Sequence, residues 1–488
     1  MHPYMQVHSL TQAEITKIHQ AALTILEQAG FQVEHSRIRE VYAAYGAKVD
    51  DHAQRVNFPS TLIEKFLADS KPYTIAGKEE KDDGTPVTCS ECYRPINQKG
   101  KPYLATRAGI SHGYYLDPDT NQPTPFSEET LKEYVYLSQK LDEDIIVRME
   151  TYPVGKGRIT QPLECRLFAW KYGVFEGGSI QMSELMPYLY DMYVIRAEYL
   201  GLSIEDVFCA SSYIISPLTM PKDFCEHVLY FYDRGLRVRI GNMFSTGGTG
   251  PVTLAGCLAL GLAERLAISV LERCLYGDKS WVLYGEMAPL DMHTMLMLLG
   301  RPEILLFNLA VIQLARYYQA AAQTLGGVSD AALPSAEAGM QKVMTALPCI
   351  LAGGCNIDPG RLGIDTLYSP IQMILDAELI SSLRRLLDGF DVNDETLAVD
   401  LINEVGPGGS FMACKHTVDY MRRELWQSKL WSGGVSYSDS SPELESDVDR
   451  AYQRWREIID TATFESQIDE QYERELLKII DRAKTEVE

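Results

Sequence analysis

Side chains suited to binding an organic cation recur where short apolar runs of this chain end. An aromatic face attracts a methylated ammonium by about 0.5 to 2 kcal/mol when both are shielded from water, and a carboxylate supplies the counter-charge. Taken singly, each tyrosine is equally consistent with core or rim packing. Their shared position predicts a binding site lined by Glu150, Tyr152, Tyr213, Asn242, Phe244, Tyr284, Glu286, Asp330, Cys355 and Asn356.

The elements that carry these residues alternate between strand and helix patterns. Helical periodicity is clearest over 128–141, 184–200, 255–275, 303–318, 336–347 and 371–387. Short apolar runs predict eight strands at 111–115, 145–150, 179–182, 207–214, 238–243, 281–284, 321–325 and 350–352. Alternation at this spacing favours a parallel sheet, and eight strands favour an α/β fold of the TIM type, a (β/α)8 barrel with its active site where the strands end.

The flanks of this barrel have a different pattern. We predict an N-terminal helical cap with an insertion over 1–105, the barrel over 106–390, and a C-terminal helical segment packing on it over 391–488. The insertion contains Cys89 and Cys92 in a CxxC motif, which has no second half at zinc-site spacing and so favours a surface hairpin over a metal site.

The amino-acid composition argues against some classes of binding partner. With 45 basic and 67 acidic residues, the net charge of −22 disfavours nucleic acid and anionic membrane surfaces. The N-terminus shows no signal peptide and no run of apolar residues is long enough to span a membrane, which predicts a cytoplasmic protein. The ten cysteines lack the spacing of a secreted disulfide framework, so we expect reduced thiols.

Several segments, in order, resemble one family. GPVTLAGCLALGLAERLA from Gly250, VLYGEMAPLDMHTM from Val282, GGVSDAALPSAEAG from Gly326, SPIQMILDAELI from Ser369 and GPGGSFMACKHT from Gly406 are similar to the trimethylamine methyltransferase family. The resemblance implies a TIM-barrel enzyme that moves a methyl group from a methylated amine to the cobalt of a partner corrinoid protein. The cobamide would arrive on that partner, with no tightly bound cofactor in this chain, and a homo-oligomer is expected.

The resemblance also implies site residues, with one departure. Gly327, Ser329, Gly408 and Gly409 would face the corrinoid, because glycine permits close approach by a bulky ring, although tight turns are the alternative. His416 is the one candidate for a catalytic role, or it bonds a loop backbone. Pyrrolysine would be expected near Gly327, yet all 488 residues are of standard types.

Members lacking pyrrolysine resemble quaternary-amine demethylases, which implies a betaine-like substrate such as glycine betaine, proline betaine or carnitine. Asn242, Asn356 or Arg148 could hold the substrate carboxylate, and Arg148 could instead form a structural ion pair. Two alternatives stay open. One is a metal-assisted barrel hydrolase or lyase using Glu286, Asp330 and His293; the other is a non-catalytic module that binds a betaine or a corrinoid protein. The leading hypothesis includes no metal site.

Overall fold

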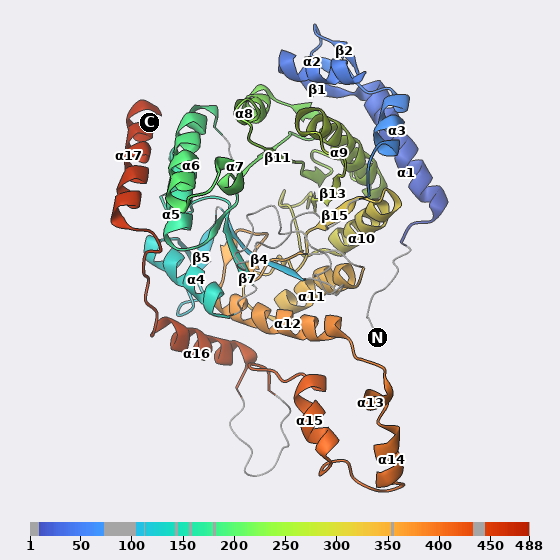
Figure 1. The fold of residues 1–488 in the computed structure, drawn as a ribbon, viewed down its shortest axis with the longest axis vertical. Helices are drawn as coiled ribbons and strands as arrows, with labels where there is room; N and C mark the ends of the chain where they lie inside the picture. The colour runs from blue at the N-terminus through green and yellow to red at the C-terminus, as the bar shows by residue number, and fades with distance from the viewer. Residues whose placement is uncertain are drawn as a thin grey trace.

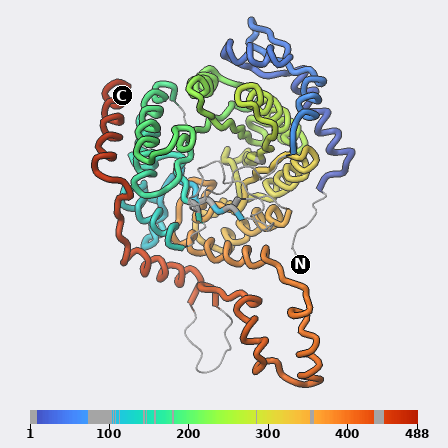
Figure 2. Tube along the Cα trace, in the orientation of Figure 1, coloured from blue at the N-terminus to red at the C-terminus, as the bar shows by residue number. Residues whose placement is uncertain are grey.

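Short strands occupy the middle of the molecule and helices surround them (Figure 1). The computed structural model describes residues 9–72, 104–111, 113–141, 145–155, 159–178, 182–352, 356–432 and 445–487. The chain trace passes repeatedly from the centre to the periphery and back (Figure 2). This is a mixed α/β fold, as predicted.

Parallel pairing organises the central strands. They are β4 (Ala105–Ile110), β7 (Ile145–Met149), β8 (Phe175–Glu176), β9 (Ala210–Tyr213), β11 (Val238–Gly241), β13 (Val282–Gly285), β15 (Ala321–Thr324) and β16 (Asn356–Ile357). They pair in the orders β16-β4-β7-β8, β9-β11 and β13-β15. Beyond them, β12 (Phe244–Thr246) pairs in parallel with β14 (Met287–Pro289). Within each of these groups, parallel pairing directs the carboxyl ends of the strands the same way.

Backbone hydrogen bonds also join neighbours that share no named ladder. The Ser211 amide donates to the Gly178 carbonyl at 2.7 Å, which links the loop after β8 to β9. The Asp358 amide donates to the Gly326 carbonyl at 3.3 Å, which links the segments after β16 and β15. These bonds align the strand ends from which the candidate site is built.

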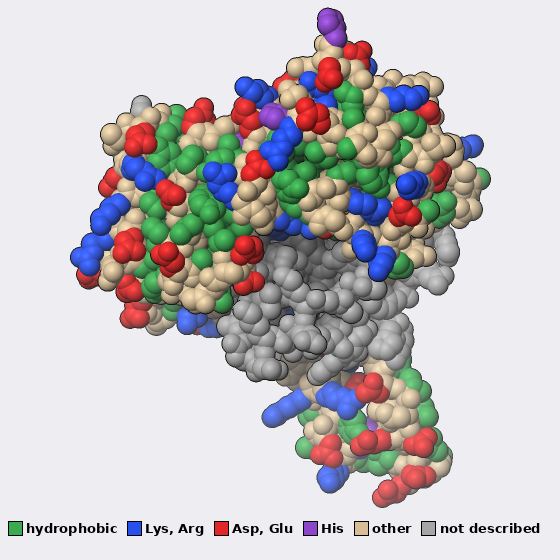
Figure 3. All heavy atoms as spheres, turned by 45° about the horizontal axis from the view of Figure 1, so that its top comes forward, with side chains coloured by type: hydrophobic (Ala, Val, Ile, Leu, Met, Phe, Trp, Pro, Cys, Tyr) green, Lys and Arg blue, Asp and Glu red, His purple; other side chains and the backbone are tan. Residues whose placement is uncertain are grey.

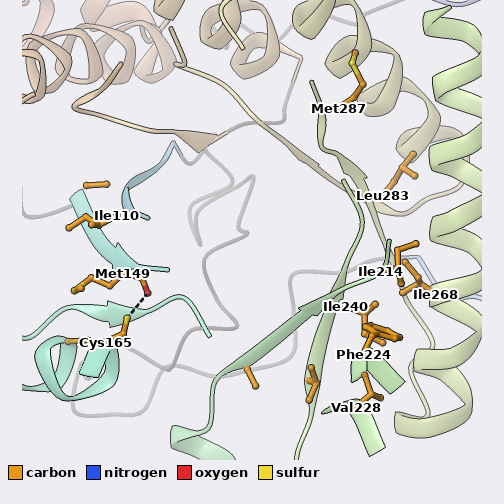
Figure 4. Close-up of a cluster of buried hydrophobic side chains, with 14 of the residues drawn as sticks. Ile110, Met149, Cys165, Ile214, Phe224, Val228, Ile240, Ile268, Leu283 and Met287 are labelled. Carbon is orange, nitrogen blue, oxygen red and sulfur yellow. Dashed lines mark hydrogen bonds between the residues drawn. The ribbon is translucent and has the colours of Figure 1, made fainter. Parts of the chain in front are cut away.

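Helices cover the outside of the strands. They are α4 (Glu128–Leu141), α5 (Gln161–Lys171), α6 (Met186–Leu200), which follows a 3-10 turn at Ser183–Leu185, α7 (Ile204–Val207), α8 (Lys222–Tyr232), α9 (Leu254–Tyr276), α10 (Pro302–Tyr317), α11 (Ala336–Leu351) and α12 (Pro370–Asp388). Figure 4 shows Ile240 of β11 beside Phe224 and Val228 of α8 and Ile268 of α9. The outward strand side chains therefore form the core with the helices.

Helix α9 is a long, strongly apolar helix of this layer. Its 23 residues are long and apolar enough to cross a membrane, but 83% of its most apolar stretch is buried inside the fold. Such burial is what a core helix shows. Its hydropathy therefore follows from its central position against the strands and neighbouring helices.

The N-terminal segment is mixed rather than only helical. It contains α1 (Gln12–Thr24), a π-helical turn at Ile25–Ala29, β1 (Phe31–Val33), α2 (Ser36–Tyr45), β2 (Lys48–Asp50), β3 (Arg55–Asn57) and α3 (Ser60–Ala68). A four-stranded sheet of order β10-β1-β3-β2 borrows β10 (Thr219–Met220) from the middle of the chain. At the start of α1, Thr11 and Glu14 form a capping box, which satisfies backbone amides at the helix start.

The remaining elements lie at one side and at the C-terminus. A small sheet of order β17-β18-β5-β6 contains β5 (Tyr114–Leu116), β6 (Pro123–Pro125), β17 (Arg361–Leu362) and β18 (Leu367–Tyr368). The C-terminal helices are α13 (Asp394–Leu397), α14 (Val399–Val405), α15 (Lys415–Glu424), α16 (Asp447–Ile459) and α17 (Glu470–Val487). Helix α16 packs on α12 and α4, and α17 packs on α6 and α5. The other three project from the body (Figure 1).

Long elements match their predictions, two short predicted strands do not, and most of the predicted strand at 179–182 lies outside the described residues. Helix α4 has the predicted bounds, and the other five predicted helices differ by a few residues at their ends. The predicted strand at 350–352 is wrong, because α11 continues to Leu351 and the strand follows at Asn356. A short apolar run does not distinguish a buried strand from a buried helix end. The first strand is also wrong: β4 precedes residue 111.

Candidate active site

A cavity of about 290 Å³ opens at the carboxyl ends of the central strands. Its lining combines three arginines, four carboxylates and two tyrosines with a few apolar and small residues. The charged and aromatic members are Arg148, Glu150, Tyr213, Arg239, Tyr284, Glu286, Asp358, Arg361 and Asp365. Charges of both signs inside one small cavity suit a small ligand that also carries both signs.

An ion pair from the end of β7 forms one wall. Arg148 Nε lies 2.9 Å from Glu150 Oε1, and the side chains are 7% and 33% exposed. Arg148 Nη2 also donates to the Gly177 carbonyl at 2.8 Å. A Cβ at position 177 would lie 2.0 Å from Glu150 Oε2, so only glycine leaves room for that carboxylate. Arg148 is thus an ion-pair partner that also lines the cavity.

Tyr213 and Glu286 also line the cavity. The Tyr213 ring lies against Gly241, where a Cβ would come within 2.4 Å of it, and the residue is 47% exposed. The nearby Glu286 charge raises the pKa of Tyr213 well above its ordinary value. Gln323 Nε2 donates to Glu286 Oε1 at 3.3 Å. The Tyr213 phenol therefore stays protonated at neutral pH and remains a hydrogen-bond donor.

Tyr284 is fixed by a buried arginine. The Arg265 guanidinium lies 4.8 Å from the centroid of the Tyr284 ring. Arg265 is itself ion-paired with Glu272 and donates to the Ile240 carbonyl at 2.8 Å. Since these partners hold the guanidinium, the ring has a defined place at the cavity wall.

An arginine between two aspartates forms the third wall. Arg361 Nη1 lies 2.9 Å from Asp358 Oδ2, and Nη2 lies 2.7 Å from Asp365 Oδ2. Burial opposes the charge on Arg361, but the two carboxylates outweigh it and raise the pKa of the guanidinium. Burial also raises the pKa of Asp365, although the Arg361 charge works against that change. The cluster therefore holds its shape through charge-assisted hydrogen bonds.

A buried lysine joins the loops that carry this third wall. Lys342 Nζ of α11 lies 2.8 Å from Asp376 Oδ2 of α12, and both side chains are almost fully buried. The same nitrogen donates to the carbonyls of Gly327 at 2.9 Å and Asp358 at 3.1 Å. Asp376 also accepts from the Gly360 amide at 2.7 Å. The pair therefore clamps the segments after β15 and β16 together.

Four of the predicted substrate residues line the cavity: Glu150, Tyr213, Tyr284 and Glu286. Others have partners elsewhere. Tyr152 packs on Phe168 with ring centroids 5.7 Å apart, and Phe244 packs on Phe307 at 5.9 Å.

Two polar candidates, Asn242 and Asp330, form hydrogen bonds that support neighbouring structure. The buried Asn242 amide donates to Glu264 Oε2 at 3.0 Å. Asp330 accepts from the Leu299 amide at 2.7 Å, and so fixes a residue of the cavity wall.

The predicted corrinoid-facing residues fall in two places. Gly327 and Ser329 are buried, and Ser329 Oγ donates to Gln341 at 2.8 Å. Gly327 has φ of +67°, and a Cβ there would meet Ile357 at 2.6 Å. Gly408 and Gly409 are exposed between α14 and α15, in the part that projects from the body. The structure thus leaves no room for a long side chain at position 327.

Other predictions lie outside the cavity or outside the described residues. His416 is in α15, where its ring stacks on Tyr420 with centroids 4.4 Å apart. Cys355 and the Cys89 and Cys92 motif lie outside the described residues. Only the backbone of Asn356 is described, in β16.

Sequence reasoning missed several charged wall residues, above all Arg239, Asp358, Arg361 and Asp365. Arg239 lies between two buried residues of β11, and this alternation indicates a side chain on the opposite face of the strand. The other three lie in the polar turn DPGRLGID that follows β16. Charged residues in a glycine-containing turn after a strand are the signal that could have found them.

The described residues contain no group of three His, Cys, Asp or Glu side chains placed to hold a metal ion. His293, a member of the metal-assisted alternative, is exposed, and its amide donates to Asp291 at 3.0 Å. Glu286, Asp330 and His293 therefore do not converge within that part of the chain.

Comparisons with known proteins identify the class. The chain matches the family model described as trimethylamine methyltransferase (MTTB) over residues 1–83 and 200–488. The chain belongs to this family and is a methyltransferase, so the predicted resemblance is confirmed.

Two relatives from Desulfitobacterium hafniense show the range of names within the family. A trimethylamine methyltransferase from strain DSM 10664 / DCB-2 is 26% identical over 92% of this chain and 89% of its own length. A glycine betaine methyltransferase from strain Y51 is also 26% identical, over 92% of each chain. Among solved structures, the Methanosarcina barkeri monomethylamine methyltransferase is 11% identical over 93% of each chain, with a TM-score of 0.41.

Proposed function

We propose that this chain transfers a methyl group from a betaine-like quaternary amine to the Co(I) centre of a separate corrinoid protein. The observation that best supports this proposal is the cavity, whose lining contains two tyrosines, four carboxylates and three arginines. A betaine has a cationic and an anionic end, and this lining offers partners to both. Family membership supports methyl transfer, and a relative named for glycine betaine is as similar to this chain as one named for trimethylamine.

Two sets of side chains in the cavity lining would orient the substrate. Tyr213, Tyr284 and Glu286 would hold the quaternary ammonium through ring faces and counter-charge, each ring contributing about 0.5 to 2 kcal/mol when water is excluded. Arg148 and Arg239 lie on the wall that the substrate carboxylate would approach. Glycine betaine, proline betaine and carnitine share this arrangement of charges.

The chemical step places few demands on the protein. The Co(I) electron pair forms the bond to the methyl carbon, the N–C bond breaks with its electrons left on nitrogen, and a neutral tertiary amine departs. No proton is transferred, so positioning supplies most of the catalysis. Gly327, where no long side chain fits, agrees with a reaction that uses no covalent amine adduct.

The acceptor would be a cobamide carried by the partner, with no cofactor bound tightly by this chain. We also propose that the central strands close into a (β/α)8 barrel spanning 106–390, flanked by the segments 1–105 and 391–488, of which α16 and α17 pack on it, and that the protein is cytoplasmic. The pairing of β12 with β14, next to the unpaired interval between β11 and β13, supports closure.

A methylation assay tests the proposal. Purified protein is mixed with Co(I) cobalamin, or a reduced cognate corrinoid protein, and with trimethylamine, glycine betaine, proline betaine, carnitine or choline. We expect methyl-Co(III) absorbance to grow with one or more carboxylated quaternary amines and not with choline, which lacks the anionic end. Methylation by trimethylamine alone, or by none of the panel, would contradict the proposed substrate class.

A further inference from the structure

Residues 391–425 form an arm that has no core of its own. They contain α13, α14 and α15, and none of these helices has a buried residue. The arm extends from the end of α12 away from the body (Figures 1 and 2). Ordering a chain segment costs about 1 to 2 kcal/mol per residue in backbone entropy, which burial of apolar surface normally offsets. Among the residues that the structure describes, the arm therefore lacks the contacts that usually order helices.

The arm exposes apolar side chains in stripes. On α15, Val418 and Met421 are 65% and 39% exposed, and Leu425, the residue directly after the helix, is 64% exposed. On α14, Val399 and Ile402 are each more than half exposed. Clustered apolar side chains on a surface mark contact sites for other molecules. The arm thus has the features of one side of an interface.

The first part of the arm is strongly acidic. Residues 391–414 include five acidic side chains, Asp391, Asp394, Glu395, Asp400 and Glu404, and no lysine or arginine. Figure 3 shows acidic, basic and hydrophobic side chains together at the lower end of the molecule, where the arm lies, and the arm's basic residues all belong to α15, after the acidic part. A surface that presents both kinds of side chain requires a partner that is basic and partly apolar.

The described body offers such a surface beside the root of the arm. A groove of about 940 Å³ lies between α12, the start of α16 and the end of α4, and three acidic side chains accompany six basic ones in its lining. The basic members are Lys140, Arg384, Arg385, Lys429, Arg450 and Arg454. The Arg450 guanidinium donates to the carbonyls of Leu430 at 2.7 Å and Glu445 at 2.6 Å, which leaves its charge available to an incoming carboxylate. This basic groove stands out on a chain of net charge −22.

The arm of one molecule is held away from its own groove. Arg385 Nη2 donates to the Glu424 carbonyl at 2.7 Å, and Trp426 Nε1 donates to Ser381 Oγ at 3.1 Å. These bonds hold residues 424–426, where the chain leaves the arm, at the edge of the groove. The acidic helices of the arm lie beyond the body (Figure 1). A groove that α13 and α14 can occupy therefore belongs to another molecule.

We propose that two copies of this chain exchange arms, each placing its acidic α13 and α14 segment in the basic groove of the other. One chain carries both complementary surfaces, which is the condition for a closed two-fold interface. The contact forms twice in the dimer, and the apolar stripes of α14 and α15 are covered in it. This inference is independent of the substrate.

Charge reversal on each surface tests the exchange. One variant combines Asp400→Arg with Glu404→Arg on the arm, and the other combines Arg450→Glu with Arg454→Glu in the groove. Sedimentation velocity over a concentration series should show a wild-type dimer and a dissociation constant at least about 100-fold higher for each variant. The control, Glu198→Arg with Glu205→Arg on exposed body positions, should dimerise like wild type.

Mixing the two variants provides the decisive measurement. In a mixed pair, the basic arm meets the acidic groove and the acidic arm meets the basic groove, so both contacts are restored. We expect an equimolar mixture to dimerise within about tenfold of wild type, and circular dichroism to show all variants folded. A monomeric wild type, unaffected variants, or a mixture that stays monomeric would each overturn the proposal. If the arm binds only the corrinoid protein, the wild type will be monomeric, which is the first of these outcomes.

Discussion

The cavity and the arm differ in whether their side chains find partners inside the chain. Around the cavity, Arg148, Arg361 and Lys342 each find a carboxylate within 3 Å, inside the same chain. Along the arm, the helices bury no side chain and expose apolar stripes. The cavity therefore keeps its shape without help from another molecule, whereas the arm needs another molecule to complete it.

This difference separates two roles within one fold. A site for positioning a small reactive cation benefits from side chains held in place before the substrate arrives. A docking arm benefits from surface that is left uncovered until a partner binds. Substitutions in the two regions should therefore differ sharply in what they change.

The largest effect is expected at the buried clamp. Lys342→Met removes the cation beside Asp376 and two donors to backbone carbonyls. Leaving a buried charge unpaired typically costs 3 to 5 kcal/mol, so we expect the free energy of unfolding in urea to fall by about that amount. The double variant Lys342→Met with Asp376→Leu should regain much of the stability yet raise the substrate KM, since the loops lose their clamp. A single variant within about 1 kcal/mol of wild type would show that the cavity is not internally fixed.

Glu286→Gln should weaken substrate use next most strongly. Loss of the counter-charge for a cationic substrate should lower kcat/KM by about 10- to 100-fold, the equivalent of roughly 1.5 to 3 kcal/mol. The pKa of Tyr213 should also fall, because the Glu286 charge is the main cause of its elevation. A tyrosinate absorbance titration against Tyr213→Phe isolates that group. Glu303→Gln, at an exposed position, is the matched control. An unchanged kcat/KM would remove Glu286 from the substrate site.

Gly241→Ala tests whether the shape of the cavity is set by close packing. The new methyl group would lie 2.4 Å from the Tyr213 ring, so the ring must move. Such overpacking typically costs about 1 to 3 kcal/mol, and we expect a higher KM with little change in kcat. Gly339→Ala, which meets no atom within 4 Å, should leave both parameters unchanged. Equal behaviour of the two variants would contradict a cavity defined by the Tyr213 ring.

Alkaline pH should reveal the tight packing beneath the cavity. Burial raises the pKa of Cys165 to about 12, next to the Met149 carbonyl that ends β7. The folded state keeps this proton, while the unfolded thiol ionises near pH 8.5 to 9. Stability from this group is therefore complete below about pH 9 and is lost as the pH rises toward 12, by about 1.4 kcal/mol per pH unit. Cys165→Ala should show a shallower pH dependence in denaturant unfolding, and parallel curves would refute the buried thiol's role.

The smallest effect on folding is expected on the arm. Changing Val418, Met421 and Leu425 together to serine should alter the monomer's unfolding free energy by less than about 0.5 kcal/mol, because these side chains are exposed. The unfolding free energies should be measured at protein concentrations where the monomer dominates. Leu266→Ala in α9, at a fully buried position, should cost about 2 to 5 kcal/mol in the same assay. A large loss from the arm variant would mean that the arm packs on its own body.

Local sequence signals determined much of the architecture. The Thr11 and Glu14 cap, the bounds of α3 and α4, and the alternation of strands with helices follow from spacing and from side chains a few residues apart. The same alternation placed Glu150, Tyr213, Tyr284 and Glu286 at strand ends, and all four line the cavity. These features depend on short-range geometry, which a single sequence displays.

Tertiary structure decided which of the remaining residues meet. Asn242 follows β11 as directly as Tyr213 ends β9, yet it turns to the buried Glu264 while Arg239 reaches the cavity. Alternation separates the two faces of a strand but does not say which face is inside when helices cover the outer one. The partners of Arg361 and Lys342, and the exposure of the arm, depend on packing between helices and loops far apart in the chain. The sequence alone determined the elements and the family chemistry, and only long-range packing decided the composition of the cavity.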